Sequence, residues 1–124
     1  MSAVTEKVKA GLILSELPGH QSRENVTIAS GQDLAFGTVV GKVTASGKYI
    51  AYDDDNSDGS ETAAGVLVGG DIDASGGDKA GVIIVKDAEL NPDLLVWATT
   101  NDATDITNGK ADLVTLGIKL RDGI

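Results

Sequence analysis

From Val26 onward the chain consists of short apolar runs separated by glycine, asparagine, aspartate and serine. Runs of this length between turn residues are typical of many short strands rather than of long helices. The sequence predicts strands over 26–29, 38–43, 49–52, 64–68 and 82–85. Ser46-Gly47 predicts a hairpin turn between two of them, and 30–33 and 75–78 are expected to be loops. We therefore expect a mainly β protein.

One of these runs, Val82-Ile83-Ile84-Val85, does not alternate between apolar and polar residues. A strand with one solvated face alternates, so both faces of this strand are expected to be covered. The core would cover one face, and a sister subunit is a candidate cover for the other.

One or two short helices are expected near the C-terminal end. Asn91-Pro92-Asp93 resembles a helix start, with asparagine as the N-cap and proline at the first helical position, and predicts one or two turns. The apolar spacing in 104–116 permits a second helix, although Asn108-Gly109 weakens it. Residues 117–121 alternate like a final edge strand.

The first 25 residues follow neither a helical nor a strand period, and Pro18-Gly19 would break any helix begun before them. We therefore divide the chain into an extended N-terminal arm, 1–25, and a β-rich domain, 26–124. Charges cancel within the arm, so the domain carries the whole net charge of −9. A neutral arm with an apolar patch can dock on another protein without an electrostatic penalty.

Composition excludes several function classes. The pI of about 4.3 argues against binding to nucleic-acid phosphates, which requires clustered lysine and arginine. The longest N-terminal apolar run is far too short to span a bilayer, so no membrane role is expected. Without cysteine there is no disulfide or thiolate metal site. With only four aromatic residues the core is small and aliphatic, and we expect a homo-oligomer to add buried surface.

The acidic run 53–59 raises the question of a calcium site. Its first half matches the start of a calcium loop, with Asp54, Asn56, Asp58 and Gly59 at the required spacing. The twelfth position, where a bidentate glutamate should stand, is Gly65. An acidic solvated turn is the favoured interpretation, and no metal ligand or cofactor is assigned. A calcium-assisted adhesion or carbohydrate-binding module remains the alternative function.

The sequence offers little for catalysis. His20 is the single histidine, and neither a cysteine nor a G-x-S-x-G turn is present. The glycines of 76–81 are spaced as in a phosphate loop, but Val82 and Ile83 replace the required lysine and serine or threonine. We expect no enzymatic activity, and a small hydrolase using paired carboxylates is a third, weaker hypothesis.

An ordered set of motifs runs through the domain: Gly47-Lys48-Tyr49, Tyr52-Asp53, Ser57-Asp58-Gly59, Ala63-Ala64-Gly65-Val66-Leu67, Asp71 to Asp73 and Leu94-Leu95-Val96-Trp97. In order and spacing these motifs resemble the head decoration proteins of lambda-like tailed phages, from about Val39 to Leu120. The most specific parts are the Asp-Gly turn, the Ala-x-Gly-Val-Leu that follows and a later Leu-x-Trp. They make Asp58, Gly59, Ala64, Gly65 and Trp97 the motif residues of the family.

The resemblance implies a small β-clip fold and a homotrimer on the outer surface of the virion capsid, at three-fold positions. It also implies assembly from protein made in the host cytoplasm, stabilisation of the expanded head against its packed DNA, and no catalysis. The arm would become ordered on the major capsid protein, and the residues expected to dock are Gly11, Leu12, Ile13, Leu14, Leu17 and Pro18. Two departures from the family pattern, Ala98 in place of proline and a longer loop over 53–61, put local loop shape in doubt.

Overall fold

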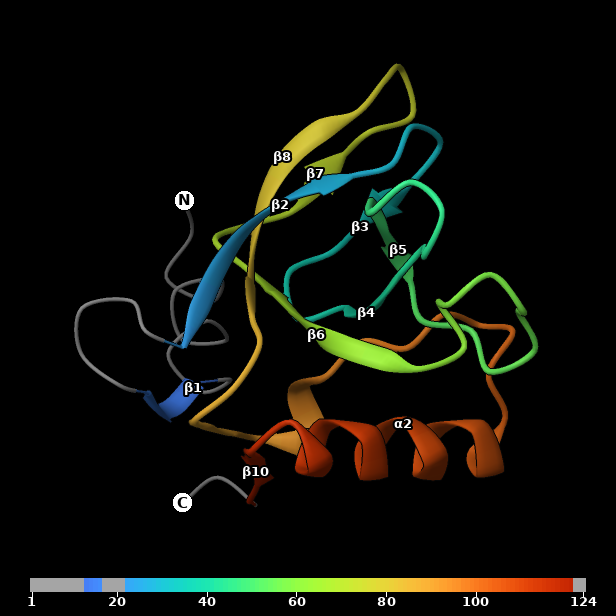
Figure 1. The fold of residues 1–124 in the computed structure, drawn as a ribbon. Helices are drawn as coiled ribbons and strands as arrows, with labels where there is room; N and C mark the ends of the chain where they lie inside the picture. Colours follow the sequence, from blue (N-terminus) through green and yellow to red (C-terminus); the bar gives the residue numbers. More distant parts are fainter. Residues whose placement is uncertain (1–12, 17–21, 122–124) are drawn as a thin grey trace.

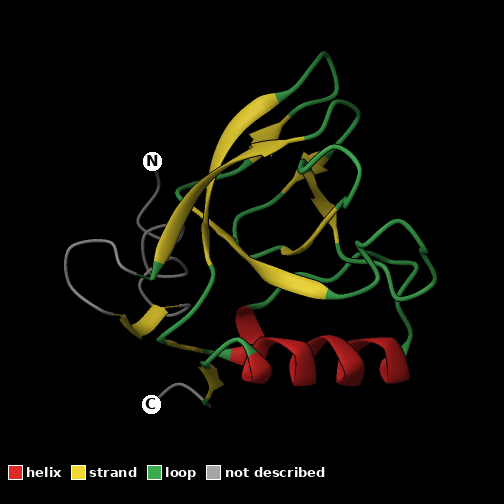
Figure 2. Ribbon diagram, viewed as in Figure 1, coloured by secondary structure: helices red, strands yellow, loops and turns green. Residues whose placement is uncertain are grey.

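The computed structural model describes residues 13–16 and 22–121. A small closed β-barrel forms its centre, and one α-helix packs along one side of that barrel (Figure 1, Figure 2). The strands are β1 (Ile13–Glu16), β2 (Arg23–Ile28), β3 (Asp33–Leu34), β4 (Val39–Lys42), β5 (Tyr49–Ala51), β6 (Ala63–Val68), β7 (Ile72–Asp73), β8 (Lys79–Ile84), β9 (Ala88–Leu90) and β10 (Ile118–Leu120). The helices are the 3-10 helix η2 (Pro92–Leu94) and the α-helix α2 (Ala103–Thr115).

The barrel strands follow the order β2-β5-β4-β6-β8. These are the five strands that the sequence predicts, with ends displaced by no more than three residues. The predicted turn at Ser46-Gly47 is confirmed, since it lies in the antiparallel β4–β5 hairpin, where the Gly47 amide donates to Val43 O at 2.8 Å. The mainly β fold class is therefore confirmed.

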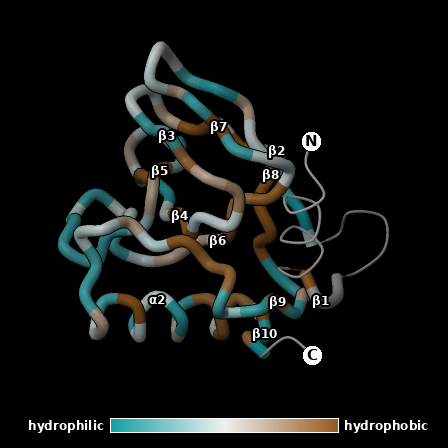
Figure 3. The backbone as a smooth tube through the Cα atoms, turned by 180° about the vertical axis from the view of Figure 1, so that it is seen from behind, coloured by the Kyte–Doolittle hydropathy of each residue, from teal (hydrophilic) through white to brown (hydrophobic). Residues whose placement is uncertain are grey.

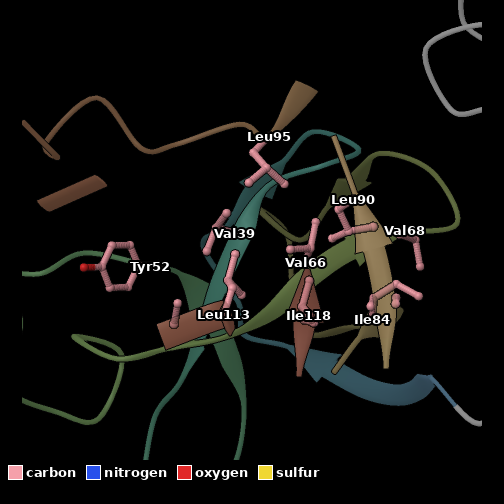
Figure 4. Close-up of a cluster of buried hydrophobic side chains, with 11 residues drawn as sticks. Val39, Tyr52, Val66, Val68, Ile84, Leu90, Leu95, Leu113 and Ile118 are labelled. Carbon is pink, nitrogen blue, oxygen red and sulfur yellow. The ribbon is translucent and has the colours of Figure 1, made fainter. Parts of the chain in front are cut away.

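Two hydrophobic clusters share the barrel strands. One contains residues from all five strands and fills the barrel: Ile28, Val40, Tyr49, Leu67 and Ile83, with Leu34 and Ala74. The other lies between the outside of the barrel and α2, β9 and β10, and Figure 4 shows its members Val39, Val66, Ile84, Leu113 and Ile118. Adjacent residues on one strand enter opposite clusters because side chains alternate across a strand.

The non-alternating run 82–85 is explained by this arrangement. Ile83 points into the barrel cluster and Ile84 into the cluster beside α2, and both are fully buried. The prediction that both faces are covered is confirmed. The suggestion that a sister subunit covers the second face is wrong, because residues of the same chain cover it.

The second predicted helix is confirmed as α2, which is continuous from Ala103 to Thr115. Asp102 caps it, and a reciprocal capping box with Asp105 satisfies amides at its start. Figure 3 shows hydrophobic and hydrophilic residues alternating along α2, as expected for a helix with one buried side. Asn108-Gly109 does not interrupt the helix, because Gly109 is buried against aromatic rings.

The region between the barrel and α2 contains shorter elements. Asn91 caps the one-turn helix η2, as predicted, and the chain after it is extended. The predicted final strand is confirmed as β10, which lies at an edge of the sheet β1-β9-β10. The sequence patterns do not predict strands β1, β3, β7 and β9. Among the described residues, no helix is long and apolar enough to cross a membrane.

Candidate functional site

Part of the predicted docking arm forms strand β1. Of the residues expected to dock, Ile13 and Leu14 lie in β1, whereas Gly11, Leu12, Leu17 and Pro18 lie outside the described residues, as does His20. Strand β1 pairs antiparallel with β9, with Ile13 opposite Leu90 and an irregularity before Ser15. The described portion of the arm is therefore an extended strand added to the chain's own sheet.

The sheet that β1 joins has β9 at its centre. Strand β10 lies parallel to β9 on the other side, and Arg121, which follows β10, forms an ion pair with Glu89 at 3.2 Å. Ile13 is half-buried and packs against the cluster beside α2. No second described strand pairs with β1, so its outer edge is free, within residues 13–16 and 22–121, to accept another strand.

The Asp58-Gly59 turn lies against the β4–β5 hairpin. Asp58 Oδ1 accepts hydrogen bonds from Ser60 Oγ at 2.5 Å and Ser60 N at 3.0 Å, and these bonds lower the pKa of Asp58. Gly59 has φ of +110°, and a Cβ there would lie 2.5 Å from Lys42 O. Only glycine fits this conformation and this close approach, so the turn fixes how the 53–61 loop meets the barrel.

Ala64 and Gly65 lie in β6, just before the residues that pair with the antiparallel strand β8. A Cβ on Gly65 would come within 2.6 Å of Ile84 O, so a side chain there would push the two strands apart. Ala64 is half-buried and packs against the cluster that fills the barrel. Gly65 therefore allows β6 and β8 to pack closely, and Ala64 contributes to the barrel core.

Trp97 links the barrel to α2. Its ring meets that of Tyr52 edge to face, with centroids 5.9 Å apart and planes at 75°. A Cβ on Gly109 would lie 2.5 Å from the Trp97 ring, so the helix backbone approaches the ring directly. Trp97 is half-buried against the cluster beside α2 and serves as a packing contact between two layers.

The carboxylates of Asp53 and Asp54 accept hydrogen bonds within the protein. Asp53 accepts from the Asp55 amide at 3.0 Å and from Thr100 Oγ1 at 2.8 Å. Tyr52 OH donates to Asp54 Oδ1 at 2.9 Å. In the part of the chain that the structure describes, no three His, Cys, Asp or Glu side chains are grouped to hold a metal ion.

Sequence reasoning missed the contact between Tyr52 and the first turn of α2. The buried Tyr52 hydroxyl is shared between Asp54 and the backbone oxygen of Asp105, each at 2.9 Å. Burial, the Asp54 hydrogen bond and the charges of nearby aspartates raise the pKa of Tyr52. The spacing of Asp102 and Asp105, typical of a capping box, is the sequence signal that locates the helix start.

Asp105 is the only buried carboxylate among the described residues, at 8% exposure. It accepts from the Asp102 amide at 3.1 Å, and this bond lowers the pKa of Asp105. Burial and the charges of Asp102, Asp55 and Asp54 outweigh it, so the pKa of Asp105 is raised. The carboxylate completes the capping box at the start of α2.

Comparison with known proteins identifies the family of this chain. A sequence model of the family described as bacteriophage lambda head decoration protein D matches residues 3–118. The match includes most of the predicted arm, the five motif residues and helix α2. No curated protein matches the chain. Since the match covers nearly the whole chain, the protein belongs to the bacteriophage lambda head decoration protein D family, a family of structural proteins of the phage capsid.

Proposed function

We propose that this protein forms trimers that bind the outer surface of the expanded phage head at three-fold positions and stabilise it against the pressure of the packed DNA. The observation that carries the proposal is the family match over residues 3–118, which spans both the arm and the barrel. The family supplies the capsid role, and the residues of this chain suggest how the attachment works.

The arm attaches by strand addition to the major capsid protein. Ile13–Glu16 is already extended, and the outer edge of β1 pairs with no other described strand. An extended segment can add to an exposed sheet edge, gaining main-chain hydrogen bonds while its apolar side chains enter pockets. Leu12, Leu14 and Leu17 are the side chains that we expect to fill those pockets.

Three arms on one trimer can together bind the capsid firmly even if each arm alone binds weakly. Ordering each arm residue costs about 1–2 kcal/mol, so one arm binds weakly. After the first arm of a trimer has docked, the other two bind at a high effective concentration, which raises the overall affinity by roughly 100-fold or more. A trimer that holds several capsid subunits at once also opposes their separation.

The acidic domain suits a protein displayed outward. The domain carries the net charge of −9, and its carboxylates gather in the 53–61 loop and at the start of α2. A surface with a large net charge of one sign resists association with similar surfaces. We infer that this acidic region faces solvent on the decorated head and keeps particles apart.

A binding assay with purified expanded heads tests the arm mechanism. Deletion of residues 1–17 removes β1 as well as the apolar patch, so a second variant, Leu12→Asp with Leu17→Asp, keeps the chain at full length. We expect both variants to retain the trimer mass and to lose coating of the heads. Val114→Asp, at an exposed position on α2 (59% exposed), is the matched control and should coat normally.

The two parts of the proposal fail in different ways. Undiminished coating by both arm variants would contradict docking through the arm. A monomeric mass for the unsubstituted protein at coating concentrations would contradict the trimer.

A further inference from the structure

The barrel is joined only loosely between β2 and β5. Ile28 and Tyr49 are the single residue pair between these strands, supplemented by the Ala29 amide donating to Tyr49 O at 3.0 Å. Strand β5 begins where β2 ends, and the chain before Tyr49 turns back through the β4–β5 hairpin. Within the described residues, no strand therefore pairs with β2 along Glu24–Thr27 on the side opposite β8.

This open edge borders a shallow groove of about 380 Å³. One wall is the β2 edge from Glu24 to Thr27, and the other is formed by Lys42, Gly47 and Tyr49 of the β4–β5 hairpin. Backbone groups of an antiparallel strand point alternately to either side, so part of the β2 main chain faces this groove rather than β8. The groove is thus a channel beside unpaired main-chain donors and acceptors.

An exposed edge of this kind is normally blunted by proline, a bulge or a covering segment. The β2–β8 register runs without a break from Arg23 to Ile28, so no bulge twists this edge away, and the stretch contains no proline. Glu24, Asn25 and Thr27 are exposed. The edge retains the geometry needed to accept a further extended segment.

Charge indicates which partner fits. Glu24 and Lys42 both line the groove, one on each wall, so the groove is electrically balanced. The 53–61 loop, which lies against the β4–β5 hairpin, and the start of α2 are strongly acidic by contrast. Two copies, each with a charge of −9, meet with less repulsion through this balanced groove than through their acidic regions.

We propose that the β2 edge over Glu24–Thr27, with the groove beside it, is the contact surface between copies of this chain in the trimer. An extended segment of the neighbouring copy lies in the groove, bonded to the β2 main chain and flanked by Glu24 and Lys42. This inference rests on the trimer of the proposed function and assigns that trimer its interface.

Cysteine labelling tests the assignment, because the natural chain contains no cysteine. Thr27→Cys places a thiol on the edge, and Ala111→Cys places the matched control on the exposed side of α2. Each variant is assembled, its mass is measured, and its reaction with a maleimide is followed. We expect the thiol at position 27 to react at least tenfold more slowly in the trimer than in protein diluted to monomer, and the control to react equally in both.

A second variant pair tests the same surface through assembly. Thr27→Glu adds a negative charge on the same edge as Glu24, and Thr107→Glu adds one to the exposed side of α2. We expect the first to weaken trimer formation at least tenfold with an unchanged circular dichroism spectrum, and the second to leave it unchanged. Trimers of normal strength in which the thiol of the Thr27→Cys variant reacts freely would overturn this interface and leave the proposed function standing. A monomeric natural chain would overturn both.

Discussion

The turns of the barrel and the interface between the barrel and α2, here called the seam, are both rich in aspartate. They shift the pKa of aspartate in opposite directions. In the turns, nearby hydrogen-bond donors stabilise the ionised form of the aspartate side chains. Hydrogen bonds from Ser60 and Ser75 lower the pKa of Asp58 and Asp73, respectively. The pKa of Asp78 is lowered mainly by its hydrogen bond with Lys48 and next by that with the Ser30 amide. In the seam, partial burial and three neighbouring aspartates raise the pKa of Asp105 despite its backbone hydrogen bond.

Aspartate residues therefore have no single effect on the stability of this fold. A carboxylate with a lowered pKa stabilises the fold above its unfolded pKa of about 3.9, and that contribution is lost as the pH falls through the folded value. A carboxylate with a raised pKa stabilises the fold below the unfolded value, and that contribution is lost as the pH rises through the folded one. The turns and the seam therefore respond to acid with opposite signs.

Removing packing from the seam is expected to have the largest effect. Leu113 is fully buried between α2 and the barrel, so Leu113→Ala should lower the free energy of unfolding by about 2–5 kcal/mol. Its neighbour Val114 is exposed, and Val114→Ala should change it by less than about 0.5 kcal/mol. Urea unfolding measures both. Equal effects would mean that α2 does not pack against the barrel as described.

Overfilling the seam should have the next largest effect. Gly109→Ala forces a methyl group against the Trp97 and Tyr52 rings, at a cost of about 1–3 kcal/mol, offset in part by a gain in helix propensity of up to about 1 kcal/mol. Gly76→Ala in the 74–78 loop meets no atom within 4 Å and is the control. A melting temperature for Gly109→Ala as high as that of the control would contradict the ring contact.

A pH series compares the two classes of carboxylate directly. Asp105→Asn keeps an acceptor for the Asp102 amide and removes the charge, so it should raise the free energy of unfolding at pH 7 and lose this advantage toward pH 3. Asp58→Asn should lower stability at pH 7 and approach the natural protein in acid. Urea unfolding between pH 3 and pH 8 checks both slopes, and parallel slopes would refute the distinction.

The smallest effect is expected at the exposed ion pair of the turns. Lys48 Nζ lies 2.6 Å from Asp78 Oδ2, and both side chains are about 40% exposed. Exposed pairs contribute about 0–1 kcal/mol, so Lys48→Gln should shift the unfolding midpoint only slightly, and less in about 1 M salt. A decrease in the free energy of unfolding as large as that of Leu113→Ala would contradict a weak, solvent-exposed ion pair.

Much of the barrel can be predicted from sequence because its strands are apolar runs bounded by turn residues. Strands β3, β7 and β9 have only two or three residues each, and β9 is defined by distant partners, β1 and β10, that no local pattern reveals. A sister subunit was only a candidate cover for the second face, where Ile84 lies, because period alone does not show which chain covers a strand.

The candidate site shows the same limit. The Asp58-Gly59 turn and Trp97 stand out through family resemblance, and the structure supplies their contacts. The Tyr52 hydroxyl bridge to Asp105 joins residues 53 positions apart, so local patterns do not reveal it, although the Asp102 to Asp105 spacing indicates the helix start. For the arm, apolar content and neutrality predict docking, but not that Ile13–Glu16 would pair with β9.

A high-resolution map of expanded heads coated with this protein would show whether the arm docks on the major capsid protein. We expect residues 11–18 to lie extended along a strand of the major capsid protein, with Leu12 and Leu17 in its pockets and three arms engaged per trimer. Trimers seated on the shell whose residues 11–18 contact only their own chain would contradict it.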